Sequence, residues 1–154
     1  MLTVIAWFTS LLRRIGSMFG MGRAGNDDFD LELREVFFAE LEDVTQSLDR
    51  AFVIWRVNAL DPGALKDLRR GFHTIKGSAL LVGADALGDF CRHLEQLTIR
   101  LIEQQVKIKV TPAMIVTVEQ AIALLPAFSK SVRDGRSPPP QAQAIANRAQ
   151  RLVA

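Results

Sequence analysis

Residues 61–82 read DPGALKDLRRGFHTIKGSALLV, a stretch with the pattern of one long amphipathic helix. Asp61 and Pro62 supply an N-cap and a first-turn proline. Apolar residues then recur at spacings of three and four, which predicts a single buried face. They are Leu65, Leu68, Phe72, Ile75, Ala79 and Val82. We expect this helix to end at Gly83.

Helical patterns continue on both sides of this stretch, and no segment shows the alternation of a strand. A first helix is predicted from about Asp30 to Asn58, after a linker at Gly20 to Asp28. A third is predicted from about Asp85 to Lys107. The fourth begins at the cap-plus-proline pair Thr111-Pro112. A weaker helical pattern covers Gln141 to Val153.

The chain is therefore predicted to be all-α. Short connections between long amphipathic helices imply an antiparallel up-down four-helix bundle, with an extra C-terminal helix and an N-terminal apolar helix. We assign residues 1–25 to the N-terminal segment and linker, 29–135 to the bundle and 138–154 to the C-terminal helix. The predicted core residues outside 61–82 are Phe37, Leu41, Val44, Leu48, Ala51, Trp55, Leu87, Cys91, Leu94, Leu97 or Thr98, Leu101, Ile115, Val118, Ile122, Leu125, Val132, Ile145, Ala149 and Leu152. Pro126 predicts a local kink in the fourth helix.

Composition limits the classes of function. The chain has 154 residues, 49% of them hydrophobic and 23% charged, which suits one folded domain with its own core. A net charge of +2, spread along the chain, does not indicate a nucleic-acid partner. The single cysteine, Cys91, excludes an internal disulfide and a Cys-rich metal site, and the default compartment is the cytoplasm.

The N-terminal residues differ from the rest of the chain. Met1 to Leu12 carries no charge, and Arg13, Arg14 and Arg23 follow it. Twelve uncharged residues are too few to span a bilayer, which needs roughly 20, and the order of charges does not suit a secretory signal. We favour an extra apolar helix. The alternative is peripheral contact of residues 1–23 with the inner face of the membrane.

His73 lies within residues 61–82 but off their apolar face. Lys76 and Gly77 follow at three and four residues and share its side of the helix. Lys66, Arg69 and Arg70 crowd the same side, where they either solvate the helix or meet an acidic partner surface. This setting suits a dianionic phosphoryl group, with Lys76 as a point charge beside it.

Gly77 needs its own explanation. A glycine inside a helix costs about 1 kcal/mol relative to alanine, so helix stability does not account for it. Close approach of another molecule to the helix would account for it. Gly77 therefore predicts a surface that a partner reaches.

The string His73-Thr74-Ile75-Lys76-Gly77-Ser78, followed by Gly83-Ala84, Leu87 and Leu94-Glu95, closely resembles the histidine phosphotransfer (HPt) domain. The resemblance covers roughly Asp30 to Gly135 and implies the helical bundle inferred above. It makes His73 the phosphorylated histidine, Lys76 the lysine beside the phosphate and Gly77 the glycine that gives the partner clearance. Within the family the chain looks most like the N-terminal modules of chemotaxis-type kinases, with those of type IV pilus signalling the nearest likeness.

In chemotaxis-type kinases a glutamate on the next helix hydrogen-bonds the histidine ring, and the resemblance places Glu95 there. Its position one residue past Leu94, at the edge of the core face, agrees. A carboxylate accepting the Nδ1–H would fix the tautomer and leave Nε2 free. The alternative for Glu95 is a surface salt bridge to Arg92 or Lys76. Arg92 itself departs from the kinases, which often carry another polar residue there.

Other candidate groups receive no chemical role. A lone histidine is usually an ordinary surface residue, but Lys76, Gly77 and the flanking pattern favour a phosphoacceptor at His73. His93 lies two residues from Glu95, hence on a different helix face. Cys91 falls on the buried face. A metal site made of the two histidines is not predicted, because carboxylates at ligand spacing are missing.

The function predicted from the sequence is phosphotransfer in a bacterial two-component phosphorelay. His73 would exchange a phosphoryl group with a histidine kinase or a response-regulator receiver aspartate. The chain would be a phosphocarrier and not an enzyme, since no nucleotide-binding loop is present, and would need no cofactor or metal, with Mg²⁺ on the receiver. The alternatives are a non-transferring helical adaptor and a membrane-tethered scaffold. Met1 as the first residue and the weakening of the helical pattern after Val132 favour a separate small protein over a piece of a kinase.

Overall fold

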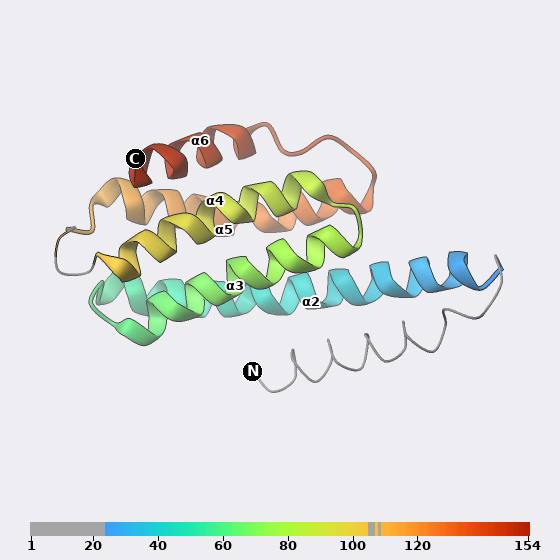
Figure 1. The fold of residues 1–154 in the computed structure, drawn as a ribbon, viewed down its shortest axis with the longest axis horizontal. Coiled ribbons are helices and arrows are strands. Elements are labelled where there is room, and N and C mark those ends of the chain that lie inside the picture. The colour runs from blue at the N-terminus through green and yellow to red at the C-terminus, as the bar shows by residue number, and fades with distance from the viewer. Residues whose placement is uncertain (1–23, 105–106, 108) are drawn as a thin grey trace. The chain divides into compact units, whose positions relative to one another are not determined.

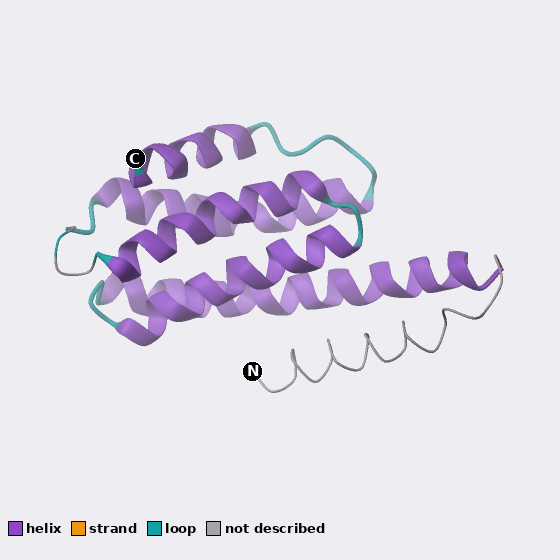
Figure 2. Cartoon of the chain, in the orientation of Figure 1, coloured by secondary structure: helices purple, strands orange, loops and turns teal. Residues whose placement is uncertain are grey.

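The computed structural model describes residues 24–104, 107 and 109–154, and the side chains of 24–27 and 29 are not described. Within this part of the chain all regular structure is helical (Figures 1 and 2). The helices are α2 (Ala24–Val57), α3 (Pro62–Leu81), α4 (Asp85–Glu103), α5 (Pro112–Arg133) and α6 (Gln141–Val153). The predicted all-α class is confirmed. The predicted N-terminal apolar helix and the membrane contact of residues 1–23 lie outside the described residues.

The chain divides into two compact units, residues 1–35 and 36–154. In the first, the described residues form the beginning of α2. In the second, α2 runs antiparallel to α5. The Arg133 guanidinium lies 4.3 Å from the centre of the Phe38 ring, and Arg56 pairs with Glu119 at 3.7 Å, so opposite ends of the two helices meet.

The remaining contacts close residues 36–154 into an up-down bundle (Figure 1). Leu48 of α2 packs against Gly71 of α3, and Gly88 of α4 packs against Ala79 of α3. The rings of Phe90 in α4 and Phe128 in α5 are 5.4 Å apart. The last helix, α6, packs on α4 and α5, and Arg148 donates a hydrogen bond of 2.7 Å to Gln120 of α5.

The predicted core is largely confirmed. Every predicted core position in α2, α3 and α4 is buried, and Val82, the residue that follows α3, is partly buried. The residues at the edges of the α5 and α6 stripes, Ile115, Val132 and Leu152, are also only partly buried. In α5 the buried set additionally includes Met114, Thr117, Ala121 and Phe128. The wider buried face follows from the position of α5, which is covered by the bundle on one side and by α6 on another.

The helix caps form as the sequence predicts. Asp61 Oδ1 accepts a hydrogen bond of 2.8 Å from the Ala64 amide, and Thr111 Oγ1 accepts one of 3.3 Å from the Met114 amide. Gly83 has φ +72°, a left-handed conformation that ends α3 and favours glycine. α5 continues through Pro126.

Two helix boundaries were predicted wrongly. α2 begins at Ala24, inside the expected linker, and Asp28 and Asp30 place exposed carboxylates in its first two turns, where the helix dipole favours negative charge. α4 ends at Glu103, four residues before Lys107. Leu101 is the last buried residue of α4, and the polar residues Glu103 and Gln104 that follow offer no apolar contact to extend the helix.

One described helix, α5, is long and apolar enough to cross a membrane by length and composition. Its contacts with α2, α4 and α6 place its buried face in the core of the bundle. Core helices pass the same length and hydropathy test as membrane spans.

Candidate functional site

α3 presents His73 to solvent. Its neighbours on the buried face, Phe72 and Ile75, are 0% and 2% exposed. The His73 side chain is 63% exposed, because each residue advances about 100° around the helix and His73 falls just outside the buried stripe. The imidazole is therefore held on a rigid helix with one face open.

Glu95 of α4 contacts both His73 and Lys76. Its Oε1 lies 2.7 Å from Nδ1 of His73, and its Oε2 lies 2.6 Å from Nζ of Lys76. The Glu95 side chain is only 6% exposed. The sequence left two alternatives for Glu95, contact with the ring or an ion pair with Lys76, and the structure shows both at once.

Small residues bring α3 and α4 close enough for these contacts. A Cβ at Gly88 would lie 3.6 Å from the Ala79 side chain and 3.7 Å from the Lys76 carbonyl oxygen. Thr98, a turn further along α4, donates a hydrogen bond of 2.7 Å to the Glu95 carbonyl and occupies a fully buried position. Glu95 thus sits on a tightly packed helix and reaches α3 without being exposed to water.

Electrostatics keep Glu95 ionised. Burial by itself raises the pKa of Glu95, but the hydrogen bonds and charges of Lys76 and His73 outweigh burial, so its pKa is lowered overall. An ionised carboxylate can only accept hydrogen bonds. Nδ1 of His73 must therefore carry the ring proton and donate a hydrogen bond to Glu95. In the neutral ring the lone pair then resides on Nε2, which has no hydrogen-bond partner among the described residues.

Gly77 lies on the surface beside this site. A Cβ added there would meet nothing within 4 Å, whereas a Cβ at Gly71, six residues earlier, would come within 2.4 Å of the buried Leu48 side chain. Packing within the described residues therefore accounts for Gly71 and does not account for Gly77. The reason for a glycine at position 77 must be sought outside the bundle.

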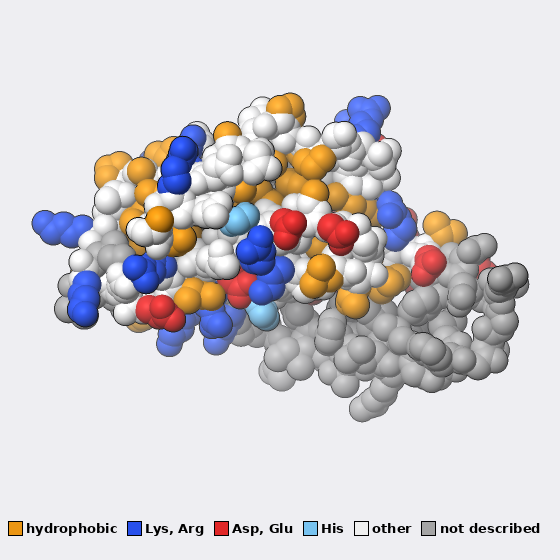
Figure 3. Space-filling view, turned by 45° about the horizontal axis from the view of Figure 1, so that its top comes forward, with side chains coloured by type: hydrophobic (Ala, Val, Ile, Leu, Met, Phe, Trp, Pro, Cys, Tyr) orange, Lys and Arg blue, Asp and Glu red, His pale blue; other side chains and the backbone are white. Residues whose placement is uncertain are grey.

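Basic side chains surround the histidine on α3. Lys66, Arg69 and Arg70 are exposed, and Arg70 lies 3.7 Å from Asp67. Figure 3 shows a face of the molecule on which Lys and Arg side chains gather next to histidine. Arg92 pairs with Asp89 at 3.6 Å and not with Glu95. The arginine at position 92, where the kinases often carry another polar residue, therefore leaves the contacts of Glu95 with His73 and Lys76 intact.

The other candidates are not part of this cluster. Cys91 is fully buried, and burial raises the pKa of its thiol, as for an inert core cysteine. His93 lies on another face of α4. Among the residues that the structure describes, no group of three or more His, Cys, Asp or Glu side chains could hold a metal ion.

Substituting Glu95→Gln should lower the free energy of unfolding by about 2 kcal/mol at neutral pH, because charge-assisted hydrogen bonds to Lys76 and His73 are lost. The pKa of Glu95 is lowered by folding, so its ionised form stabilises the fold above the unfolded value of 4.5. That contribution disappears as pH falls through the lowered pKa. The difference between wild type and variant should therefore shrink below pH 4.5.

Urea unfolding at a series of pH values measures this difference. Asp67→Asn is the matched control, because Asp67 is 56% exposed and its ion pair with Arg70 is solvated. It should change stability little at any pH. A Glu95→Gln variant with the same pH dependence as wild type would contradict the assigned charge state.

The chain matches a model of a known family. The family model described as the Hpt domain matches residues 32–128, well over half of the chain. This range contains His73, Lys76, Gly77 and Glu95 and ends inside α5. Comparison with curated proteins gives no match.

Proposed function

Because this chain belongs to the Hpt domain family, we propose that His73 is its phosphoacceptor in a two-component phosphorelay. Hpt domains are phosphocarriers that lack catalytic activity of their own, and they typically interact with histidine kinases and response-regulator receivers. The family thus gives the class of function. The residues that perform it, the partners and the direction of transfer are our proposal.

The observation that carries the assignment is the hydrogen-bonded His73–Glu95 pair with Nε2 open. Nε2 attacks the phosphorus of a receiver aspartyl phosphate, an N–P bond forms, and the acyl phosphate P–O bond breaks to restore the aspartate carboxylate. No proton leaves the ring in this step, so the imidazole becomes positively charged. Glu95, which accepts the Nδ1–H, stabilises that charge. The reverse step returns the phosphoryl group to an aspartate.

Lys76 has a second role in this proposal besides the one that its sequence position suggests. In the structure its ammonium group pairs with Glu95. We propose that it keeps Glu95 ionised before transfer. Afterwards it turns towards the phosphoryl oxygens on His73, since Lys76 and His73 lie one turn apart on the same face of α3. The lysine side chain is 29% exposed and can make this movement at the surface.

The bound Mg²⁺ and the acidic residues of phosphoryl transfer would belong to the receiver. Transfer of this kind depends on positioning and charge neutralisation, and the carrier contributes mainly a well-placed nucleophile. We therefore propose no cofactor of the chain's own. The narrower likeness to chemotaxis-type and pilus-type kinases stays a prediction.

Site mapping tests the proposal. The chain is incubated with a receiver phosphorylated by a labelled donor, then digested at alkaline pH and analysed by mass spectrometry. We expect one phosphopeptide, containing His73, whose modification is lost on mild acid treatment. Phosphate on His93, on a hydroxyl side chain, or nowhere after tests with several receivers and kinases would contradict the assignment and favour a non-transferring adaptor.

A further inference from the structure

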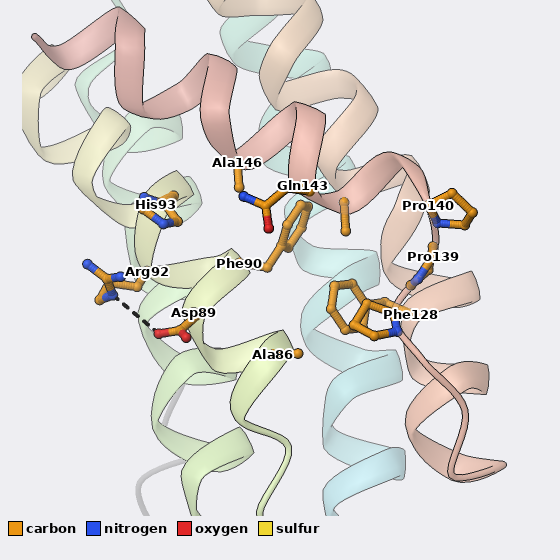
Figure 4. A pocket seen from close by; sticks show the side chains of 12 residues that line it. Ala86, Asp89, Phe90, Arg92, His93, Phe128, Pro139, Pro140, Gln143 and Ala146 are labelled. Atoms are coloured by element: carbon orange, nitrogen blue, oxygen red, sulfur yellow. Dashed lines mark ion pairs between the residues drawn. The ribbon is translucent and has the colours of Figure 1, made fainter.

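A pocket on the opposite side of α4 is not explained by phosphotransfer. It has a volume of about 540 Å³ and lies between α4, α5, the segment 138–140 and α6 (Figure 4). Its lining includes Phe90, Phe128 and Ala146. This volume is within the range of small-molecule sites. The segment 138–140 and α6 lie beyond residue 128, where the family match ends, so these added residues create the pocket.

The pocket has an apolar end and a polar end. Figure 4 shows Phe128, Pro139 and Pro140 at one end, and Asp89, Arg92 and His93 at the other. Phe90 lies between them. Asp89, Arg92 and His93 are the only titratable side chains in the lining, and all three belong to α4.

His93 supplies a polar atom in an unusual state. Its Nδ1 is shielded from solvent and has no hydrogen-bond partner among the described residues. A buried N–H without an acceptor is rare, so the tautomer with the proton on Nε2 is favoured. Because Nδ1 is shielded, Nε2 is the ring nitrogen that a ligand can reach, and it offers a hydrogen-bond donor.

Arg92 supplies a second donor. Its ion pair with Asp89 is long, at 3.6 Å, and both side chains are substantially exposed, at 45% and 71%. Such an exposed pair contributes little and is easily exchanged for another partner. A ligand carboxylate could take the place of Asp89 on the guanidinium and gain a planar, two-point contact.

We propose that this pocket binds a small aromatic carboxylate. The ring system packs on the exposed Pro138 and Pro140, over the edge of the buried Phe90–Phe128 pair, and the carboxylate accepts hydrogen bonds from Arg92 and from Nε2 of His93. The proposal is independent of the phosphoacceptor assignment, because His73 is not in the pocket lining.

The probes for a test are 2-naphthoate and its uncharged analogue 2-naphthamide, added to the full-length chain and followed by backbone amide NMR. With naphthoate we expect saturable shifts at residues 86–93 and 138–146. Naphthamide should bind about tenfold more weakly, as should naphthoate to Arg92→Gln, because each change removes a charge-assisted contact. Arg151→Gln, an exposed change elsewhere on α6, should bind like wild type.

Filling the pocket gives a second test. Gln143 lines the pocket from an exposed position on α6, so Gln143→Trp should abolish the saturable shifts without harming the core. Gln150→Trp, an exposed position on the same helix outside the lining, is the matched control and should bind normally. Equal binding of naphthoate and naphthamide, unchanged binding by Gln143→Trp, or no saturable shift would overturn the proposal.

The pKa of His93 provides a further readout, because a ligand should raise this pKa only if its carboxylate lies beside the ring. Desolvation by burial and the nearby Arg92 charge lower the pKa of His93, while Asp89 opposes them. A carboxylate bound beside the ring favours its protonated form, so saturating naphthoate should raise the pKa of His93. Naphthamide should not raise it. An unchanged His93 titration with saturating naphthoate would contradict the contact.

Discussion

Replacing His73 by Gln is expected to abolish phosphoryl acceptance from both a phosphorylated receiver and a cognate kinase. The amide of glutamine cannot act as the nucleophile, so the initial rate should fall by at least about 1,000-fold, the scale seen when an essential nucleophile is removed. The fold should persist, because the His73 side chain is 63% exposed. A glutamine amide can also donate a hydrogen bond to Glu95, which limits the change in stability to roughly 1 kcal/mol.

The chain provides its own control, since it contains two histidines. His93→Gln should accept the phosphoryl group at the wild-type rate, because His93 lies in the pocket between α4 and α6 and not beside Glu95's carboxylate. Labelling is measured with a radioactive phosphodonor and checked for acid lability. Undiminished labelling of His73→Gln would exclude His73 as the acceptor, and loss of labelling in both variants would point to a folding effect.

Replacing Gly77 by Trp should slow transfer from a receiver by about 100-fold while leaving the bundle folded. The indole would fill the space next to His73 that the partner needs, and a displacement of about 1 Å from the reactive geometry is enough for an effect of this size. The side chain itself meets no obstacle in the protein, because a Cβ at position 77 has no neighbour within 4 Å. Stopped-flow or quench-flow transfer assays measure the rate.

Two controls separate access from reactivity and from stability. Phosphoramidate, a small phosphodonor, should label Gly77→Trp and wild type at similar rates, since it needs no docking surface. Gly77→Ala should raise the free energy of unfolding by up to about 1 kcal/mol, whereas Gly71→Ala should lower it by about 1–3 kcal/mol through its collision with Leu48. Equal slowing of both donors would mean that the indole disturbs the histidine and not the docking.

Most of the fold could be predicted from the spacing of apolar residues. The six predicted core residues of α2, from Phe37 to Trp55, are all buried, and the caps at Asp61 and Thr111 form. Local signals of this kind report one helix at a time. The same spacing covers Phe128, which lies three residues after Leu125 and four before Val132 and is buried, but it could not show that Phe128 packs on Phe90, which is distant in sequence.

The candidate site was only partly visible in the sequence. Helical spacing places His73, Lys76 and Gly77 on one face of a single helix, and the structure brings them together as expected. The contact of Lys76 with Glu95 depends on how closely α3 and α4 approach, which the small residues Gly88 and Ala79 decide. The pocket at His93 could not be predicted, because it arises only when α6 folds back over α4 and α5.

The pairing of Lys76 with Glu95 bears on how long a phosphoryl group would stay on the chain. The formal charges of these two side chains cancel, and the ring keeps its proton in the proposed step, so a dianionic phosphoryl group on the positively charged ring leaves about one net negative charge at the site. The occupied carrier would therefore be under-neutralised compared with a receiver that holds a divalent cation, and the exchange equilibrium would favour release. Occupancy of His73 would then track the current supply of donors, and the chain would report a signal without storing it.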